Sequence, residues 1–271
     1  GMNPGDVIAI GPLVLALDRV VALALGLAFL WGIDAVLRRR RLAAPSLGWW
    51  AMLAGLAGAR IGYVAIHWQS FALEPWEALR AWLGGWYWPG GVLAVLFLLV
   101  WRLRVHRRAL IEAALLLGLL GAVWAGFLAS RNNETALRLP PELAFETLDG
   151  RKIALVDYRG KPLILNLWAT WCPPCRRETP MLARTAAEQG QVPLILVNQG
   201  EARDTVGRYA AEQGLPTQAF VLDPDGSLGA LSGSGALPTT LLIGPDGTVL
   251  AAHMGEISRV QIDILARQAQ R

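Results

Sequence analysis

The sequence predicts two domains of different class, an all-α transmembrane domain followed by an α/β domain. Hydrophobic residues make up 54% of the chain and charged residues 17%, and residues 1–130 hold ten of the twelve tryptophans. The only two cysteines, Cys172 and Cys175, lie between an apolar run and a helix-like run. A length of 271 residues allows about two domains. We assign residues 1–130 to the transmembrane domain, 131–141 to a linker and 142–271 to the α/β domain.

Four apolar runs in the first domain are long enough to cross a membrane. A spanning helix needs about 20 consecutive, mostly apolar residues. The candidate spans are residues 13–37, 46–68, 84–101 and 109–129. The alternative is a bundle of buried soluble helices, but most of these runs lack a polar face at the helical period. We therefore predict four transmembrane helices in contact with membrane lipid.

The arginines predict how the spans are oriented. Four of them follow the first span, at residues 38–41. Four more lie between the third and fourth spans: Arg102, Arg104, Arg107 and Arg108. The loop after the second span carries only Arg80, beside two glutamates. By the positive-inside rule both clusters are cytoplasmic, so both termini and the α/β domain lie outside the cytoplasmic (inner) membrane, in the periplasm of a Gram-negative cell.

The formal net charge of +4 belongs to the first domain. Residues 1–130 carry eleven arginines and six acidic residues, whereas residues 131–271 carry fourteen basic and fifteen acidic residues. The positive charge lies beside the predicted spans, where orientation in the membrane accounts for it. We therefore predict no nucleic-acid partner.

Three segments of the first domain form a pattern of their own: residues 10–13, Gly-Ala-Arg-Ile-Gly-Tyr-Val at 58–64, and Gly-Gly-Trp-Tyr-Trp-Pro-Gly-Gly at 84–91. Over about the first 100 residues the chain resembles prolipoprotein diacylglyceryl transferase. That family has a histidine where this chain has Pro89, and its later signature is absent from the sequence. The resemblance implies a degenerate relative that serves as an anchor or docking surface, with a working lipid transferase as the weaker alternative.

Arg60 is a charged residue inside the second predicted span. A charge at membrane depth is costly and is a functional candidate by default. The alternative is an arginine whose side chain extends to the outer lipid headgroups. The sequence leaves both interpretations open.

Cys172 and Cys175 are spaced as a dithiol redox site requires. A strand, the Cys-Pro-Pro-Cys segment and a helix follow one another, which is the context in which this spacing predicts redox activity. At a helix N-terminus, unpaired N–H groups and the macrodipole favour a thiolate. Cys172 is therefore the candidate nucleophile and Cys175 the resolving sulfur. Pro173 and Pro174 stiffen the loop, and proline is tolerated in a first helical turn.

A structural disulfide and half of a zinc site are the alternatives for this cysteine pair. Zinc needs about four ligands in all, and the histidines, His67, His106 and His253, are not at ligand spacing. We therefore predict no metal, and no cofactor beyond the redox-active cysteine pair. Because the first domain has no cysteine, it cannot pass electrons by thiol exchange. A separate membrane thiol protein is the predicted electron donor.

The α/β domain combines continuous apolar runs with helical patterns. Asp149-Gly150 between apolar flanks predicts a hairpin. Apolar runs at 163–168 and 193–198 are typical of buried parallel strands, and the helix between them, at 176–189, predicts a crossover. The cysteines then lie at the C-terminal end of the first strand, where ligands bind in open α/β sheets. The remaining predicted elements are strands at 220–222, 241–243 and 248–250 and helices at 204–213 and 258–270.

Five segments of this domain carry a more specific pattern. They are Asn-Leu-Trp-Ala-Thr-Trp-Cys-Pro-Pro-Cys at 166–175, Glu178 with Pro180, Val-Asn-Gln-Gly-Glu at 197–201, Leu-Pro-Thr-Thr at 237–240, and Pro-Asp-Gly at 245–247. Over some 130 residues the chain is similar to the TlpA/ResA-like branch of the thioredoxin superfamily. The resemblance implies a thioredoxin fold for the α/β domain.

The resemblance also implies roles for residues around the cysteines. Pro238 is expected to form a cis peptide bond and to pack against the cysteine pair. Because Asn166 stands where thioredoxin has a buried aspartate, Glu201 becomes the candidate for proton transfer near the cysteines. The alternative for Glu201 is a solvated residue at a helix start. The predicted substrate surface comprises Trp171, Pro173, Pro174, Leu237 and Thr239.

Together these features predict a membrane-anchored periplasmic thiol–disulfide oxidoreductase that acts on protein disulfides or thiols. The resemblance favours the reducing direction, with apocytochrome or metal-site cysteines as substrates, which is the chemistry of cytochrome c biogenesis. A thiol oxidase or isomerase is an alternative, because the Cys-Pro-Pro-Cys segment alone does not set the direction. A copper-delivering module is another, since copper(I) favours thiolates, although no third ligand is evident.

Overall fold

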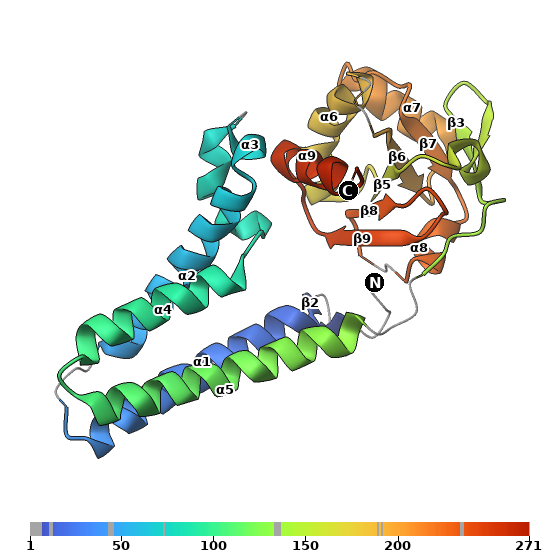
Figure 1. The fold of residues 1–271 in the computed structure, drawn as a ribbon. Helices are drawn as coiled ribbons and strands as arrows, with labels where there is room; N and C mark the ends of the chain where they lie inside the picture. Colours follow the sequence, from blue (N-terminus) through green and yellow to red (C-terminus); the bar gives the residue numbers. More distant parts are fainter. Residues whose placement is uncertain are drawn as a thin grey trace. The chain divides into compact units, whose positions relative to one another are not determined.

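The computed structural model of the protein describes residues 7–10, 13–42, 46–72, 74–132, 137–188, 190, 192–233 and 236–270. Residues 6–133 belong to one compact unit and residues 134–271 to another. The first is helical and the second contains a large sheet (Figure 1). We call them the helical unit and the sheet unit.

Long apolar helices make up most of the helical unit. Its elements are strands β1 (Val7–Ile10) and β2 (Leu13–Ala16), helices α1 (Leu17–Arg39), α2 (Leu47–Ile66), α3 (Trp68–Phe71), α4 (Trp88–Leu103) and α5 (Arg107–Asn132), and 3-10 turns η2 (Pro75–Leu79) and η3 (Ala81–Leu83). Three described stretches are long and apolar enough to cross a membrane: Val20–Arg39, Leu47–Ile66 and Arg107–Ser130. Helix α4 is apolar but has only 16 residues. The predicted count of four spans therefore stays a prediction.

Two predicted spans begin before the helices do. Residues 13–16, assigned to the first span, form β2 and pair antiparallel with β1. Valine occurs in both segments and isoleucine in β1, and both residue types favour strands. The third span was predicted from residue 84, whereas α4 begins at Trp88. Gly84 and Gly85 precede it with φ of 91° and 83°, which glycine adopts readily but a helix does not. Of the segment 10–13 in the transferase-like pattern, residues 11 and 12 lie outside the described residues.

Glycines allow α2 and α4 to pack closely. A Cβ added to Gly58 would lie 2.7 Å from the carbonyl oxygen of Gly90, and one added to Gly91 would lie 2.8 Å from that of Gly55. Any larger residue at Gly58 or Gly91 would therefore push the two backbones apart. Small residues at such contacts are typical of helices that associate in a membrane.

Arg60, on α2, binds backbone carbonyls of the segment that precedes α4. Its guanidinium donates hydrogen bonds to the carbonyl oxygens of Glu77 (2.7 Å), Ala78 (2.9 Å), Gly84 (2.7 Å) and Gly85 (3.1 Å). One arginine can do this because it presents five N–H donors in a fixed fork. The structure thus gives Arg60 a positioning role for this segment, which neither interpretation from the sequence anticipated.

A seven-stranded mixed sheet is the framework of the sheet unit, in the order β4-β3-β7-β6-β5-β8-β9 (Figure 1). Its strands are β3 (Ala144–Thr147), β4 (Lys152–Ala154), β5 (Leu163–Trp168), β6 (Leu194–Gln199), β7 (Phe220–Asp223), β8 (Thr239–Ile243) and β9 (Val249–Met254). Its helices are α6 (Pro173–Ala187), α7 (Arg203–Glu212), α8 (Ser227–Leu231) and α9 (Arg259–Gln268), with the 3-10 turn η4 (Leu155–Tyr158).

The central strand β5 positions the cysteines. All six of its residues are buried, and it pairs parallel with β6 and antiparallel with β8. Helices α6, α7 and α9 contribute to one apolar core, which includes Trp168 of β5. A second core includes Leu165 of the same strand, whose side chain points to the opposite face. The predicted order of strand, helix and parallel strand is therefore confirmed, as is the hairpin at Asp149-Gly150, which joins β3 to β4. Strands β8 and β9 also pair antiparallel.

The predicted linker comprised residues 131–141. In the structure the chain already belongs to the sheet unit before residue 141. Helix α5 extends to Asn132, and Leu139 is buried in the sheet unit. Arg138 forms a β-bridge with Thr248. Residues 133–136 lie outside the described residues. The difference arises because a polar, proline-bearing composition fits the edge of a sheet as well as a linker.

Candidate redox site

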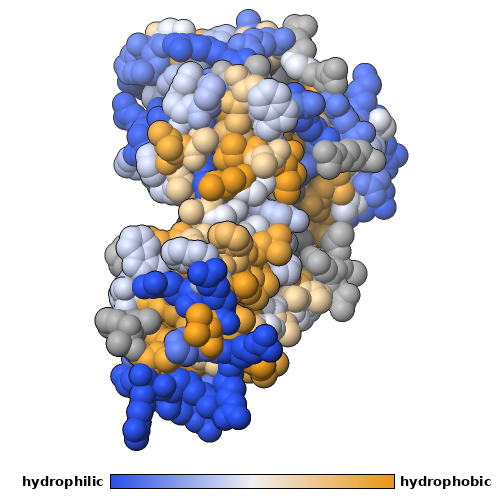
Figure 2. Space-filling model, turned by 60° about the vertical axis from the view of Figure 1, so that its left-hand side comes forward, coloured by the Kyte–Doolittle hydropathy of each residue, from blue (hydrophilic) through white to orange (hydrophobic). Residues whose placement is uncertain are grey.

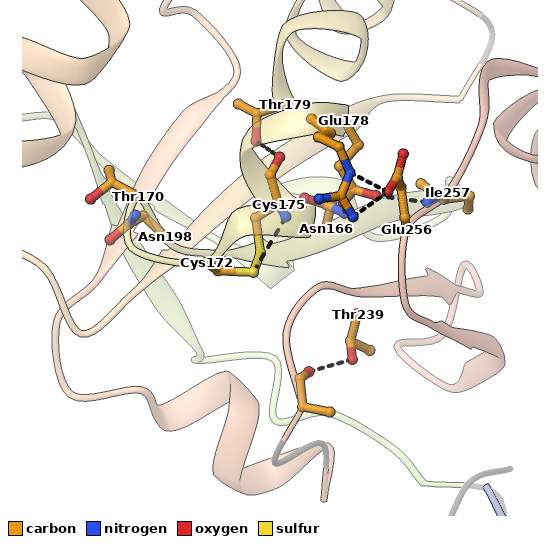
Figure 3. Close-up of a disulfide and its surroundings, with 12 residues drawn as sticks. Asn166, Thr170, Cys172, Cys175, Glu178, Thr179, Asn198, Thr239, Glu256 and Ile257 are labelled. Atoms are coloured by element: carbon orange, nitrogen blue, oxygen red, sulfur yellow. Dashed lines mark hydrogen bonds and ion pairs between the residues drawn. A yellow bond between two sulfur atoms is a disulfide. The ribbon is translucent and has the colours of Figure 1, made fainter. Parts of the chain in front are cut away.

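Cys172 and Cys175 lie at the start of α6 and form a disulfide (Figure 3). Cys172 is the N-cap residue of the helix, and its Sγ accepts a hydrogen bond from the N–H of Cys175 at 3.3 Å. The two Cα atoms are 5.3 Å apart, a usual separation for bonded cysteines. Cys172 is 3% exposed and Cys175 is fully buried. A protein partner must therefore reach the sulfurs over the residues around the start of α6.

Pro173 and Pro174 limit the number of N–H groups near Cys172. They occupy the first positions of α6, and proline has no N–H to donate. Among the described residues, the N–H of Cys175 is the one donor to Cys172 Sγ. A helix start without prolines offers several free N–H groups. A thiolate on Cys172 would thus receive fewer backbone hydrogen bonds than the first turn of a helix normally provides.

The predicted substrate residues come from two neighbouring segments. Trp171 directly precedes Cys172 and is 67% exposed. The Leu237–Pro238 peptide bond is cis, as the resemblance implied. Thr239 pairs with Leu167 near the end of β5 that leads to the cysteines, and Figure 3 shows it in the surroundings of the disulfide. The structure therefore brings two groups to one end of the sheet: Trp171, Pro173 and Pro174, and Leu237, Pro238 and Thr239.

Glu201 holds the turn that leads to Cys172. Its carboxylate accepts hydrogen bonds from the backbone N–H of Thr170 (2.7 Å), from the Thr170 hydroxyl, and from Asn198 Nδ2 (2.7 Å). Thr170 lies two residues before Cys172, so Glu201 lies beside the cysteine segment. These contacts make it a positioning residue for the turn, and its part in proton transfer stays a prediction.

Glu178 is a buried carboxyl one helical turn beyond Cys175, and the sequence reasoning assigned it no role. It is 2% exposed. Its Oε1 accepts a hydrogen bond from Asn166 Nδ2 at 2.8 Å, and its Oε2 accepts one from the N–H of Ile257 at 2.7 Å. Burial raises the pKa of Glu178 to about 7, although both hydrogen bonds act to lower it. A carboxyl with a pKa near neutrality can take up and release a proton at working pH.

Two charged side chains beside Glu178 have opposite effects on it. Glu256 raises the pKa of Glu178 and Arg177 lowers it, and both effects are smaller than that of burial. The Arg177 guanidinium lies 2.8 Å from the Glu256 carboxylate. Because these two groups are paired with each other, the buried environment dominates the titration of Glu178.

Asn166 links Glu178 to the strand that follows the cis-proline. Its Nδ2 also donates to Thr240 Oγ1, in β8, at 3.0 Å. Asn166 is fully buried, and its Oδ1 has no hydrogen-bond partner among the described residues. A side-chain amide has both donors and an acceptor, so Asn166 can serve either protonation state of Glu178. Hydrogen bonds, direct or through Asn166, thereby connect Glu178 of α6 to β5, to β8 and to the segment before α9.

The sequence contains a signal for Glu178 in its spacing. Residues three or four apart share one helix face, and Glu178 follows Cys175 by three positions. Thr179 and Leu182 on α6 are also buried. An acidic residue on a buried helix face is rare. A carboxyl whose pKa is shifted far from its ordinary value is a candidate functional residue.

Two family models match the chain. Residues 138–252 match the AhpC/TSA family, and residues 15–130 match prolipoprotein diacylglyceryl transferase. The sheet unit therefore carries a thioredoxin-family domain with ResA-like relatives, and the helical unit carries a transferase-like region. Both resemblances inferred from the sequence are confirmed.

Relatives of this chain include several thiol–disulfide oxidoreductases. It is 33% identical over 167 residues to thiol-disulfide oxidoreductase ResA of Geobacillus thermodenitrificans, which covers 59% of this chain and 95% of that protein. It is 30% identical over 167 residues to ResA of Bacillus subtilis, covering 59% of this chain and 92% of that one. The solved structure of MTB DsbF in its mixed oxidized and reduced forms is 26% identical, with a TM-score of 0.43, over 48% of this chain and 96% of that one. The chain therefore belongs to the ResA family of thiol–disulfide oxidoreductases.

Proposed function

We propose that this protein is a membrane-anchored disulfide reductase whose dithiol lies in the periplasm. The observation that carries the proposal is the Cys172–Cys175 disulfide at the head of α6, with the buried carboxyl of Glu178 one turn further along. Thiol–disulfide exchange moves two electrons between this pair and a protein partner.

In the reducing direction the reaction has two exchange steps. The Cys172 thiolate attacks a substrate disulfide, a Cys172–substrate disulfide forms, and the other substrate sulfur leaves as a thiolate. The Cys175 thiolate then attacks the Cys172 sulfur, the intramolecular disulfide forms, and the second substrate sulfur leaves. The substrate gains two electrons from the cysteine pair. Its two thiolates take up protons equal in number to those that Cys172 and Cys175 released.

We assign Glu178 as the acceptor of the proton from Cys175. Cys175 is fully buried, so its thiol needs a nearby base within the protein before it can attack. Glu178 is buried on the same helix, and its pKa of about 7 lets it accept a proton and later release it. Glu201, the residue predicted for this task, has Thr170 and Asn198 as its partners. It is better suited to hold the turn.

The two prolines of the cysteine segment support the reducing direction. A dithiol is a strong oxidant when its reduced form is stabilised, and hydrogen bonds to the thiolate are one source of that stability. Pro173 and Pro174 remove two such donors, which leaves the N–H of Cys175. A less stabilised thiolate gives up its electrons more readily, which favours reduction of the substrate.

The helical unit serves as the anchor in this proposal. Three of its helices have the length and composition of spans. Helix α4 would be the fourth span: its 16 residues correspond to about 24 Å, and a locally thinner bilayer offsets the difference. The arginine clusters would then lie in the cytoplasm and the sheet unit in the periplasm. Because residues 1–130 contain no cysteine, electrons must come from a separate membrane thiol protein.

The reduction potential of the full-length protein in detergent tests the direction. We expect a midpoint near that of thioredoxin, about −270 mV. A midpoint near about −120 mV, that of a strong thiol oxidant, would reverse the assignment.

A proline variant tests the reason given for that direction. Pro174→Ala restores one N–H, and one hydrogen bond to a charged sulfur is worth about 1.4 kcal/mol, which corresponds to a rise in potential of about 30 mV. Pro180→Ala, in the same helix but beyond the first turn, is the matched control and should leave the potential unchanged. Equal shifts of the reduction potential in both variants would show that the missing N–H donors of Pro173 and Pro174 do not set the potential.

A further inference from the structure

One end of the helical unit is strongly cationic. At this end α1 finishes and α4 turns into α5. Eight arginines gather there: Arg38, Arg39, Arg40, Arg41, Arg102, Arg104, Arg107 and Arg108. Figure 2 shows hydrophilic side chains beside apolar ones in the helical unit, in the lower part of the view.

The carboxylates at this end are already paired. Asp34 lies 2.8 Å from Arg38, and Glu112 binds Arg40 through both of its oxygens. Among the described residues, neither Arg107 nor Arg108 has a carboxylate partner. Two guanidinium groups at the start of α5 are therefore available to an anion from outside the protein.

Arg107 and Arg108 line a cavity of about 430 Å³. Arg40 and His106 add further polar groups to its lining. The rest of the lining is apolar and consists of Leu42, Val105 and Ala109. The cavity thus offers cationic hydrogen-bond donors and an apolar surface to one ligand.

We propose that this cavity binds the phosphate group of an anionic phospholipid. Arginine holds phosphate through paired N–H···O hydrogen bonds in a geometry that lysine cannot match. A phosphodiester has the oxygens for two such arginines, and the glycerol carbons beside it would contact Leu42 and Val105. The inference rests on the membrane insertion proposed above but not on the redox direction.

The surroundings of the cavity favour a lipid over free phosphate. Val105 lies among the arginines and is 80% exposed, which suits the boundary between headgroups and acyl chains better than water. Trp49 and Trp101, near the ends of α2 and α4 that lie on this side, are 60% and 58% exposed, as interfacial tryptophans are. Basic pockets between spanning helices on the cytoplasmic side are known sites for anionic headgroups. Free phosphate would use the arginines alone.

Lipid titration of the full-length protein in a neutral detergent tests the site. The probes are short-chain phosphatidylglycerol, short-chain phosphatidylcholine and inorganic phosphate, with native mass spectrometry to measure bound ligand. The test variant is Arg107→Gln/Arg108→Gln. The matched control is Arg38→Gln/Arg39→Gln, which removes two arginines from the same end but outside the cavity.

We expect the test variant to bind phosphatidylglycerol about tenfold more weakly than wild type, because it loses charged hydrogen bonds, and the control to bind like wild type. Phosphatidylcholine should bind to the wild type about tenfold more weakly than phosphatidylglycerol, because it has no net charge. Inorganic phosphate should also bind about tenfold more weakly, because it makes no apolar contacts. Equal weakening in the two variants would show diffuse attraction and overturn the site. Equal binding of phosphate would overturn the choice of lipid, and equal binding of phosphatidylcholine would overturn the role of charge.

A second variant covers the case in which the glutamine variant does not fold. Arg107→Lys/Arg108→Lys keeps both charges and loses the paired donors, so we expect about threefold weaker binding of phosphatidylglycerol. Unchanged binding in this variant would contradict the proposed geometry. A failure of membrane insertion would be recognised separately, because the protein would then be released from cells without detergent.

Discussion

The two units of this chain place their large apolar side chains in opposite ways. In the sheet unit Trp168 and Phe220 are fully buried, as the hydrophobic effect requires in water. In the helical unit Phe97 is 76% exposed and Leu23 is 69% exposed. Glycines such as Gly58 occupy the contact between α2 and α4 instead, because lipid provides no hydrophobic drive between helices and close packing takes its place.

The two units also place their polar and charged side chains differently. The sheet unit buries Glu178 and Asn166 within its core, near the cysteines, and burial is what brings the carboxyl into the neutral range. The helical unit gathers charge at one end and uses Arg60 to bind loop carbonyls. The cysteine pair and the buried carboxyl that can exchange protons with it thus belong to the same unit, the sheet unit. Changes in one unit should therefore leave the function of the other intact.

The largest expected effect is the loss of all disulfide reduction in Cys172→Ser. The variant lacks the nucleophile, so reduction of a disulfide-linked fluorescent peptide by the chemically reduced protein should fall to background. Membrane extraction and lipid binding should match wild type, because the helical unit has no cysteine. Cys175→Ser serves as the comparison, since it should retain the first exchange step and accumulate a mixed disulfide. Residual multiple turnover in Cys172→Ser would break the assignment of the two sulfurs.

The second expected effect is on the pH dependence of stability. The pKa of Glu178 is about 7 in the folded chain against a reference value of 4.5, so the folded state binds more protons between these pH values. The free energy of unfolding of the sheet unit should therefore fall by up to about 3 kcal/mol as pH rises from 4.5 to 7. Glu178→Gln should remove this slope.

Thermal unfolding of the oxidised full-length protein measures this slope, because disulfide-bonded cysteines do not titrate. The transition of the helical unit should not change between wild type and Glu178→Gln. A slope that persists in the variant would show that another group is responsible.

The third expected effect is on packing in the helical unit. Gly58→Leu inserts a side chain where the carbonyl oxygen of Gly90 lies within 2.7 Å of the added Cβ, so the helical unit should lose about 1–3 kcal/mol of stability. Gly118→Leu is the matched control, because a Cβ there meets nothing within 4 Å. The reduction potential should be unchanged in both. A shifted potential in Gly58→Leu would show that the two units are coupled.

The smallest expected effect is that of Asn166→Leu on Glu178. The substitution removes a hydrogen bond that lowers the pKa of Glu178, so the pKa should rise by about one pH unit. Thr240→Val removes a partner of Asn166 without touching Glu178 and should shift the pKa less. In both variants, the pH at which the free energy of unfolding of the oxidised protein stops falling measures the pKa of Glu178. An unchanged or lower pKa in Asn166→Leu would exclude a positioning role for this amide.

Features that depend on neighbouring residues could be predicted from the sequence. The strand that ends before the cysteines, the hairpin at Asp149-Gly150 and the first turn of α6 follow from local patterns, and the structure has all three. The cis bond before Pro238 came from family resemblance, since no local rule distinguishes it from other prolines.

Features that depend on distant contacts were missed. Glu178 receives a hydrogen bond from Ile257, 79 residues away in sequence, and its burial follows from the whole fold. The carbonyl partners of Arg60 lie between 17 and 25 residues further along, so its role could not be read from its own span. The strand β2 was taken for helix because a short apolar run fits both states.

Thiol labelling in cells shows on which side of the membrane the cysteine pair lies. Because the chain has only two cysteines, a thiol reagent that cannot cross membranes reports on Cys172 and Cys175 alone. Spheroplasts treated with a permeant reductant, washed and exposed to this reagent should show labelling without lysis. Labelling that appears only after the membrane is opened would place the dithiol in the cytoplasm and contradict the account.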